Sequence, residues 1–297
     1  MVGIGQPASD PVSALGRLGV QTLTLRDSAG PGGPLDAPRL LDQHVLFLTT
    51  AGHGSVEVDF AAYPCRPGTL VWARPGQVLC WVAGGGMDAV LVCWSAALPM
   101  LDGDAAIDPA GPTHWQLAGE DEDAVINEVS QLVVDCQRHH DGDLPAELLH
   151  HQLAVLTLRV AALSGATDVD QSASGQDNDV FGRFRQAVER CHARTRRVED
   201  YAAMLGCSVR TLTRASLAAT GRSAKQLVDD RVALQARRLL AATDEPVAEI
   251  GQRLGFPEPT NFGRFFHREV GASPGGFRAA ARRRPTRVPR QRVPPES

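Results

Sequence analysis

The sequence has almost no lysine, few aromatic residues and no long apolar run. Lys225 is the only lysine among 30 basic residues, and aromatic residues make up 5% of the 297 residues. No uninterrupted apolar stretch reaches the roughly 20 residues of a membrane-spanning helix. The first residues also lack a basic start followed by an apolar run, which is the pattern of a secretory signal. We therefore expect a cytoplasmic globular protein with no membrane partner.

The cysteines and histidines do not follow the spacing of a metal site or a disulfide framework. The six cysteines contain no C-x-x-C pair, so we expect reduced, packed thiols. The strand-rich region has no His-x-His: His44 and His53 are nine residues apart, with Glu57 as the nearest carboxylate. The pairs at 139–140 and 150–151 fall on expected helices, where adjacent side chains point in different directions. We therefore expect no metal and no cofactor.

Charge divides the chain into an acidic and a basic half. Residues 1–179 contain 7 basic and 23 acidic residues, a net charge of −16, whereas residues 180–297 contain 23 basic and 11 acidic residues, a net charge of +12. The polar segment 164–179 lies where the sign changes and predicts an interdomain linker. A basic half indicates a module for nucleic acid or a membrane surface, although a solvated surface without a partner has the same composition.

Short apolar runs fill the first part of the acidic half. They are rich in valine and aromatic residues and are separated by turn sequences such as AGHG, RPG and AGGG. This pattern predicts short strands in a β-sandwich or small barrel. The predicted strands are 44–50, 55–60, 69–73, 77–83 and 88–94.

Two amphipathic helices are expected after the strands, over about 120–139 and 145–164. Apolar residues share one side of the first helix and form a heptad-like stripe on the second. The two sets are Val125, Val129, Leu132, Val133 and Cys136, and Leu149, Leu153, Leu156, Val160 and Leu163. The stripe is either covered within the chain or packs against a second copy in a homodimer.

The basic half contains an internal repeat. YAAMLGCSVRTLTRASLAATG at 201–221 aligns with IGQRLGFPEPTNFGRFFHREVG at 250–271, so that the two Leu-Gly pairs match and Arg214 matches Arg264. Each copy has the pattern of a short helix, a glycine turn and a second helix, which is typical of a helix-turn-helix motif. Two such motifs in the basic half predict binding in the major groove of DNA.

The second copy contains an aromatic stripe at helical spacing. Pro259 suits the first turn of a helix, and Phe262, Phe265 and Phe266 would be buried on one side. Between the copies, residues 223–243 predict one helix that is capped by its first residue, a serine. Its length of about 31 Å is close to the roughly 34–36 Å between successive major-groove faces.

These motifs resemble the DNA-binding domain of the AraC/XylS family of transcription regulators, over about residues 181–284. The resemblance is carried by LGCSVRTLTR with Gly221 seven residues after Arg214, and by RVALQARRLLAAT, EIGQRLGF, TNFGRFFHREVG and SPGGFR. This chain has Ser216-Leu217 where the family usually has Phe-Lys, which affects a phosphate contact and some packing in the first motif. Upstream, PGTLVWARPGQVLCW resembles the cupin-like sensor domain of many members.

The resemblance implies a bacterial regulator that binds double-stranded DNA through two recognition helices. On the first helix, Val209, Leu212 and Leu217 would face the core. Arginine pairs with guanine, asparagine with adenine, and threonine with a thymine methyl or a phosphate. The expected base contacts are Arg210, Thr213, Arg214, Thr260, Asn261 and Arg264, and the expected phosphate anchors are Ser208, Thr211 and Arg222. An activator of this family would also contact RNA polymerase.

The resemblance also implies a small-molecule effector in the acidic half. Trp72 and Arg74 alternate onto one face of a strand and Trp81 follows the RPGQV turn, so an aromatic platform beside a cation suits a small polar or anionic ligand. The alternative, that each of these tryptophans belongs to the packed core, is slightly favoured. The candidate ligand-binding residues are Trp72, Arg74, Trp81 and His44.

Two other functional classes remain open at this point. One is a ligand-independent DNA-binding protein whose barrel only dimerises, and the other is a cupin-type enzyme. No nucleophile motif, phosphate loop or pair of catalytic carboxylates occurs in the sequence, so we expect that the protein is not an enzyme.

The predicted fold has two domains: an all-β cupin-like jelly roll with a helical appendix, and an all-α double helix-turn-helix domain. The predicted ranges are a flexible arm at 1–20, a sensor barrel at 21–112, a helical pair at 113–165, a linker at 166–179, the DNA-binding domain at 180–284 and a basic tail at 285–297.

Overall fold

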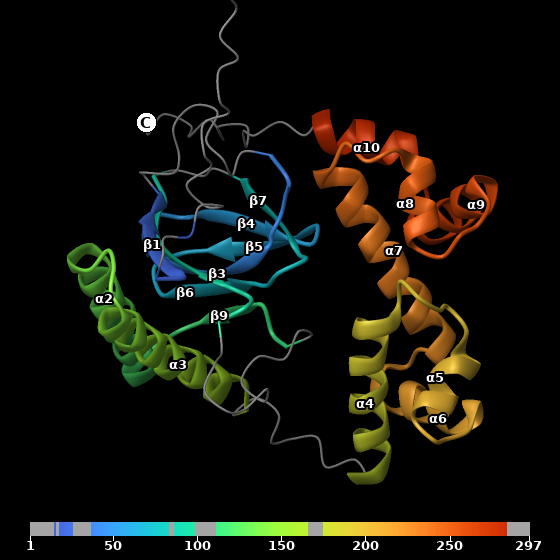
Figure 1. The fold of residues 1–297 in the computed structure, drawn as a ribbon, viewed down its shortest axis with the longest axis horizontal. Helices are drawn as coiled ribbons and strands as arrows, with labels where there is room; N and C mark the ends of the chain where they lie inside the picture. Colours follow the sequence, from blue (N-terminus) through green and yellow to red (C-terminus); the bar gives the residue numbers. More distant parts are fainter. Residues whose placement is uncertain are drawn as a thin grey trace, which may run out of the picture. The chain divides into compact units, whose positions relative to one another are not determined.

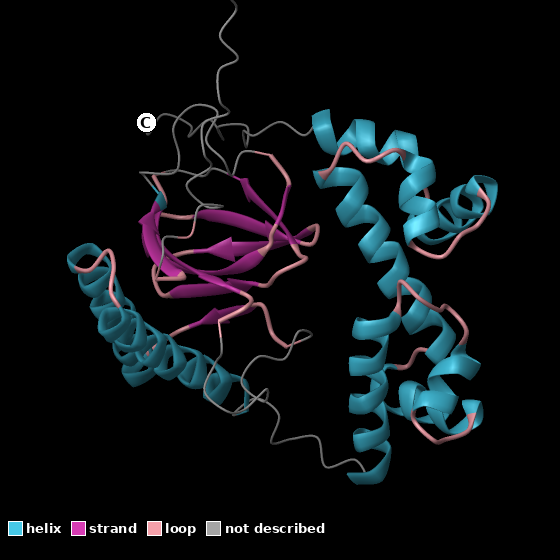
Figure 2. Ribbon diagram, in the orientation of Figure 1, coloured by secondary structure: helices cyan, strands magenta, loops and turns pink. Residues whose placement is uncertain are grey.

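The computed structural model describes residues 15, 18–25, 37–82, 86–98, 111–165 and 175–283. The chain separates into two compact units (Figure 1), one of residues 1–164 with 285–297 and one of residues 165–284. The strands belong to the first unit, whereas the second is helical (Figure 2). In the described part of the chain, no helix is long and apolar enough to cross a membrane.

The first unit contains two antiparallel sheets. One has five strands in the order β1-β8-β3-β6-β9, and the other has four in the order β2-β7-β4-β5. The strands are β1 (Val20–Thr24), β2 (Arg39–Leu40), β3 (Gln43–Ala51), β4 (Gly54–Val58), β5 (Ala61–Cys65), β6 (Thr69–Ala73), β7 (Val78–Val82), β8 (Asp88–Ser95) and β9 (His114–Gln116).

The central strand β3 is buried on both faces. Val45 and Phe47 belong to the core that both sheets share, where the Phe47 ring lies 4.8 Å from the Trp81 ring between centroids. Leu46 and Leu48 belong to a second core on the outer face of the five-stranded sheet. Successive strand residues point to opposite faces, so one strand contributes to both cores. This two-sheet arrangement confirms the predicted jelly-roll class.

Helices α2 (Gly119–Arg138) and α3 (Asp143–Gly165) cover the outer face of the five-stranded sheet. Asp135 of α2 accepts hydrogen bonds from the side chains of Gln131 at 3.0 Å and Gln152 of α3 at 2.7 Å, which lower its pKa. The predicted apolar stripe of α3 is covered within the chain, not left for a second copy. Its buried members are Leu149, Leu153, Leu156 and Val160.

The strand predictions missed β1, β2, β5 and β9. The predicted strand 55–60 is also too long, because Asp59 and Phe60 have φ angles of 51° and 70° and turn the chain between β4 and β5. The Asp59 carboxylate stabilises this turn by accepting hydrogen bonds from the Val78 amide at 3.0 Å and the Gln77 side chain at 2.7 Å. β9 lies in the range that was predicted to be helical.

Two predicted flexible segments end earlier than expected. Leu18 is buried and β1 begins at Val20, so the chain enters the first unit before residue 21. Helix α4 begins at Gly175, inside the predicted linker 166–179. The polar first turn of a helix has no apolar periodicity, so its sequence is not distinguishable from a linker. Most of the predicted arm, most of the linker and the basic tail lie outside the described residues.

The second unit consists of seven described helices. They are α4 (Gly175–Cys191), α5 (Val198–Met204), α6 (Val209–Thr220), α7 (Ala224–Ala242), α8 (Val247–Arg253), α9 (Pro259–Val270) and α10 (Pro274–Arg283). Helix α7 is the predicted spacer: Ser223 caps it with its side chain and forms a capping box with Gln226. Its 19 residues extend for about 28 Å.

Candidate nucleic-acid interface

Two helix-turn-helix motifs form in the second unit. Helices α5 and α6 are joined through Gly206, and α8 and α9 through Gly255, at φ angles of +63° and +77°. A left-handed backbone conformation favours glycine because a Cβ would be strained there. Each repeated Leu-Gly pair therefore marks the turn between a short helix and a recognition helix, as predicted.

The recognition helix of the second motif is α9. Pro259 lies in its first turn, where no backbone donor is needed, and Phe262, Phe265 and Phe266 are buried. Gly251 of α8 allows α9 to approach closely, because a Cβ at this position would lie 3.1 Å from Cβ and Cγ of Phe262. The opposite side of α9 is exposed and carries Thr260, Asn261 and Arg264.

The recognition helix of the first motif is α6, and its buried side differs from the prediction. Leu212 is fully buried, as expected, together with Ala215 and Ser216. Val209 and Leu217 were predicted to face the core, but they are 38% and 48% exposed. Leu217 follows Ser216 by one residue, and a rotation of about 100° per residue carries its side chain away from the core.

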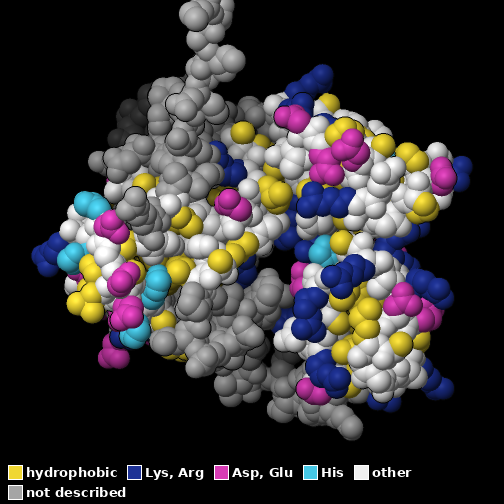
Figure 3. Space-filling view, viewed as in Figure 1, with side chains coloured by type: hydrophobic (Ala, Val, Ile, Leu, Met, Phe, Trp, Pro, Cys, Tyr) yellow, Lys and Arg dark blue, Asp and Glu magenta, His cyan; other side chains and the backbone are white. Residues whose placement is uncertain are grey.

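The expected base-contacting residues all lie on the outward sides of α6 and α9. Arg210 and Arg214 are exposed, and Thr213 is half-buried. Two guanidinium groups and a hydroxyl on α6, and a guanidinium, an amide and a hydroxyl on α9, can pair with base edges or phosphates. The space-filling view in Figure 3 shows many basic side chains on the helical unit.

The three expected phosphate anchors have different surroundings. Ser208 is the N-cap of α6: its hydroxyl accepts a hydrogen bond from the Thr211 amide at 3.0 Å and lies 2.9 Å from the Thr211 hydroxyl. Both hydroxyls thus lie at a helix N-terminus, where backbone donors favour anions. Arg222 instead forms two contacts with the Asp230 carboxylate, at 2.6 and 2.8 Å.

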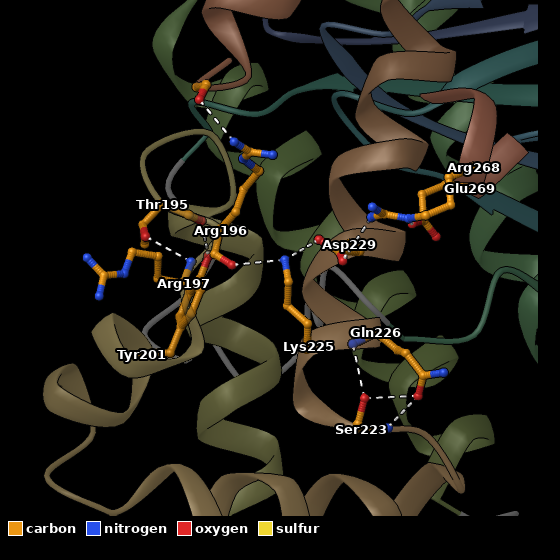
Figure 4. A network of polar contacts seen from close by, with 11 residues as sticks. Thr195, Arg196, Arg197, Tyr201, Ser223, Lys225, Gln226, Asp229, Arg268 and Glu269 are labelled. Carbon is orange, nitrogen blue, oxygen red and sulfur yellow. Dashed lines mark hydrogen bonds and ion pairs between the residues drawn. The ribbon is translucent and has the colours of Figure 1, made fainter. Parts of the chain in front are cut away.

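A polar network that was not anticipated links segments of the two motifs (Figure 4). Its central residues are Arg196, between α4 and α5, and Asp229, on α7. Burial lowers the pKa of Arg196, while the charge of Asp229 acts in the opposite direction. The sequence offered one signal for this network, the position of the only lysine, Lys225, one turn before Asp229.

The ligand-binding candidates of the first unit are buried. The Trp72 indole donates a hydrogen bond of 3.2 Å to Nδ1 of His44, and the Arg74 guanidinium lies 4.8 Å from the Trp72 ring centroid. Trp81 lies apart from these three, in the core between the sheets. Burial and the charge of Arg74 lower the pKa of His44 to about 4, so this imidazole is neutral at physiological pH.

A half-open cavity of about 400 Å³ lies between α2 and the five-stranded sheet. Most of its lining is apolar, and Ile126 and Val134 at its surface are 39% and 45% exposed. Glu122 supplies a carboxylate at one end. The described residues contain no group of three His, Cys, Asp or Glu side chains that could hold a metal ion.

A two-sheet unit joined to a basic unit with two helix-turn-helix motifs defines a class of two-domain DNA-binding proteins. Comparison with known proteins agrees with this class. A helix-turn-helix domain family matches residues 201–280. The HTH-type transcriptional activator RhaS of Salmonella arizonae is 32% identical over 249 residues, which cover 80% of this chain and 85% of that protein.

Other similar proteins extend this comparison. The MmsAB operon regulatory protein of Pseudomonas aeruginosa is 26% identical and covers 81% of this chain and 76% of its own length. Among solved structures, ToxT of Vibrio cholerae O395 is similar with a TM-score of 0.43, 12% identity and coverage of 88% and 97% of the two chains. The DNA-binding domain of AdpA in complex with a target DNA has a TM-score of 0.31, 36% identity and coverage of 36% and 95%.

The chain belongs to the AraC/XylS family of transcription regulators. It is a DNA-binding transcription regulator, as the repeat and the charge division predicted.

Proposed function

We propose that α6 and α9 both insert into the major groove of one DNA duplex and read its sequence. The observation that carries this proposal is the repeated arrangement of the two helices: each buries one side in its motif and exposes an arginine at the same position, Arg214 or Arg264. Arg210 and Thr213 on α6, with Thr260 and Asn261 on α9, are the further base or backbone contacts.

Phosphate contacts would orient the protein on the duplex. Ser208 and Thr211 lie at the N-terminus of α6, where their hydroxyls and the backbone amides suit a phosphate oxygen. Arg222 is the third proposed anchor, and it would have to share its guanidinium between Asp230 and the phosphate.

Fluorescence anisotropy of the full chain on DNA from upstream of its own gene tests the proposal. Specific binding should weaken steeply with salt, because phosphate contacts release counterions. Arg214→Ala and Arg264→Ala should each weaken it further. If both variants bind like the wild type, these helices do not read the DNA.

We also propose that a small molecule controls the regulator through the first unit. The barrel candidates Trp72 and Trp81 are 1% and 5% exposed and pack in apolar cores. The cavity beside α2 is therefore the better place for an effector, since it offers about 400 Å³ of mostly apolar space with Glu122 at one end. Binding there would act by shifting the populations of conformations of the chain.

A homodimer through α3 is the third part of the proposal. Its exposed side carries a seam of four apolar residues and one histidine at alternating spacings of four and three residues, which is the heptad pattern of a coiled coil. The members of this α3 seam are Leu144, Leu148, His151, Val155 and Leu158. Leu144 is 79% exposed, and such a seam is expected to pack against the same helix of a second copy.

In the ligand-independent alternative, the first unit only dimerises and the cavity binds no effector. A thermal-shift screen distinguishes ligand-controlled from ligand-independent regulation, because a ligand that binds the native state raises the melting temperature. We favour regulation without catalysis over the cupin-type enzyme, since the relatives are transcription regulators. The relatives named as activators also support the proposal that this protein contacts RNA polymerase.

A further inference from the structure

The connection between α4 and α5 contacts the turn of the second motif. The Arg196 guanidinium lies over the Phe256 ring, 3.6 Å from its centroid, and its Nη2 donates a hydrogen bond of 3.3 Å to the Gly255 carbonyl. A Cβ on Gly255 would lie 3.7 Å from the Ala193 carbonyl, so the two backbones are also close. Arg196 therefore joins the first motif to the second by a stacked and hydrogen-bonded contact.

Arg196 is itself held firmly by the first motif. The preceding carbonyl, of Thr195, accepts a hydrogen bond of 3.0 Å from the hydroxyl of Tyr201, which is completely buried in α5. The Thr195 hydroxyl also donates to the Asp200 carboxylate. These hydrogen bonds attach the backbone of the connection to α5. Through Arg196, the position of α5 therefore restrains the position of the second motif.

Asp229 of α7 forms the second half of the network (Figure 4). Lys225 donates to Oδ1 of Asp229 at 2.5 Å and to the Arg196 carbonyl at 3.2 Å. Oδ2 of Asp229 lies 3.5 Å from Nη2 of Arg268, which is on α9. Asp229 is 7% exposed, so its charge depends on these cations for compensation. Asp229 thus contacts the second motif directly through Arg268, and Lys225 links it to the connection that precedes the first motif.

We propose that Arg196 and Asp229 are positioning residues that hold α9 at one orientation relative to α6. The base pairs that α6 reads and those that α9 reads are the two half-sites of one chain, and the fixed orientation makes the protein bind them at a single spacing. The inference rests on the proposed DNA contacts of α6 and α9. The spacer helix α7 packs against α8, α9 and α10, and apolar contacts of this kind have little directional preference. The network adds a second connection with directional polar contacts, which restricts those movements.

The arrangement of the network supports a positioning role more strongly than a general contribution to stability. Apart from the Lys225–Asp229 pair within α7, its contacts join different segments. Arg196 contacts the turn after α8, Lys225 of α7 contacts the α4–α5 connection, and Asp229 of α7 contacts α9. None of the four residues Arg196, Lys225, Asp229 and Arg268 is among the proposed base contacts. Removing one of them should therefore alter the relation between the half-sites without changing how either half-site is read.

The test measures how binding depends on half-site spacing. An operator is first selected from random duplex DNA with the full-length wild-type protein, and variants of it receive one or two extra base pairs between the half-sites. The wild type should lose about tenfold or more in affinity for each lengthened operator, because one recognition helix loses its base contacts. The Arg196→Ala and Asp229→Asn variants should lose less than about threefold in affinity when the same base pairs are inserted.

Further variants separate positioning from folding. Arg268→Gln changes a side chain that is 64% exposed, and it should broaden the spacing tolerance while leaving the melting temperature of the protein unchanged. Arg253→Ala removes an exposed contact with Glu245 outside the network and should keep the wild-type spacing profile. Each variant is also measured on a duplex with one half-site, where its affinity should equal that of the wild type.

The possible outcomes distinguish this inference from the proposed function. If Arg268→Gln and Asp229→Asn keep the wild-type spacing profile, the network does not position the motifs and the inference is wrong. If the wild type selects no operator, or Arg264→Ala leaves binding to the selected operator unchanged, the proposed DNA contacts fail instead. A broadened profile in the network variants alone supports the inference.

Discussion

Ser216 and Phe266 occupy equivalent positions of the two recognition helices, and both side chains are completely buried. The Ser216 hydroxyl donates a hydrogen bond of 2.7 Å to the Leu212 carbonyl of its own helix. The Phe266 ring instead contacts those of Phe262 and Phe277, at centroid distances of 5.9 and 5.6 Å. The two recognition helices therefore share a backbone pattern but differ in packing: α9 buries three phenylalanine rings, whereas α6 buries Leu212, Ala215 and Ser216.

This difference predicts unequal effects of truncation on stability. Phe266→Ala should destabilise the second motif by about 3–5 kcal/mol, because a large buried ring leaves a cavity. Ser216→Ala should change stability by less than about 1 kcal/mol, since the Leu212 carbonyl is within a helix and keeps its backbone partner. Hydrogen exchange of α8–α9 and α5–α6 peptides in the full chain measures both effects. Equal losses in the two variants would contradict this account of the packing.

The proposed base contacts predict a selective loss of DNA affinity. Arg214→Ala and Arg264→Ala should each cost about 1–3 kcal/mol of binding free energy on the selected operator, and less on unrelated DNA, because bidentate pairing with guanine is lost. Arg159→Ala is a matched control in the first unit, where Arg159 pairs with Glu128 at 3.0 Å. Equal losses on operator and unrelated DNA would mean that the two arginines contact only the phosphate backbone.

The α3 seam predicts a homodimer. One charged residue introduced into the seam should disrupt this dimer. Leu148→Asp should convert the dimer to a monomer, since an unpaired carboxylate would be buried between two helices. Sedimentation velocity at micromolar concentration measures the change. Glu147→Gln, a neighbouring residue outside the seam, serves as the control and should remain dimeric. A wild-type protein that is monomeric at this concentration would refute the seam as a dimer interface.

Burial of His44 predicts a loss of stability in mild acid. The pKa of His44 is lowered from 6.5 to about 4 in the folded chain, so the unfolded chain binds the proton more readily between these values. The stabilising effect of the neutral imidazole is therefore complete above about pH 6.5 and declines as the pH falls toward 4, by up to about 3 kcal/mol. Thermal unfolding monitored by tryptophan fluorescence from pH 4.5 to 7.5 should show this decline.

A control isolates the contribution of His44 from that of other groups. His44→Gln keeps a hydrogen-bond acceptor near the Trp72 indole but has no titratable group. Its melting temperature should fall less between pH 6.5 and 4.5 than that of the wild type. A variant with the same pH dependence as the wild type would show that other residues cause the acid sensitivity.

The cavity beside α2 predicts saturable binding of an apolar molecule. Nile red, a neutral apolar dye, should increase in fluorescence with the wild type, and Ile126→Trp should abolish the increase by filling the cavity. Asp123→Trp adds the same side chain to an exposed position of the same helix, outside the cavity lining, and should leave binding intact. Loss of dye binding in both variants, or in neither, would place the dye elsewhere.

The sequence by itself determined the features that depend on local backbone chemistry. The glycine turns at Gly206 and Gly255, the cap at Ser223 and the first-turn Pro259 follow from the conformations that these residues favour. The charge division and the repeat then predicted the DNA-binding half, and apolar runs predicted the longer strands. The short strands β2 and β9 were not predictable, because two or three residues contain too little pattern.

Only the tertiary structure decided which side chains lie in a core, a seam or a network. Trp72 and Trp81 are each suited to a pocket or to packing. Trp81 is buried because the two sheets meet around it, and Trp72 because α2 and α3 cover the outer face of the five-stranded sheet. Helix α3 is apolar on two sides, and the position of α2 and the sheet decides which side is covered. Arg196 and Phe256 are distant in sequence, and no local preference brings them together. Such contacts depend on how separate elements pack, and the pattern of any one segment does not contain that information.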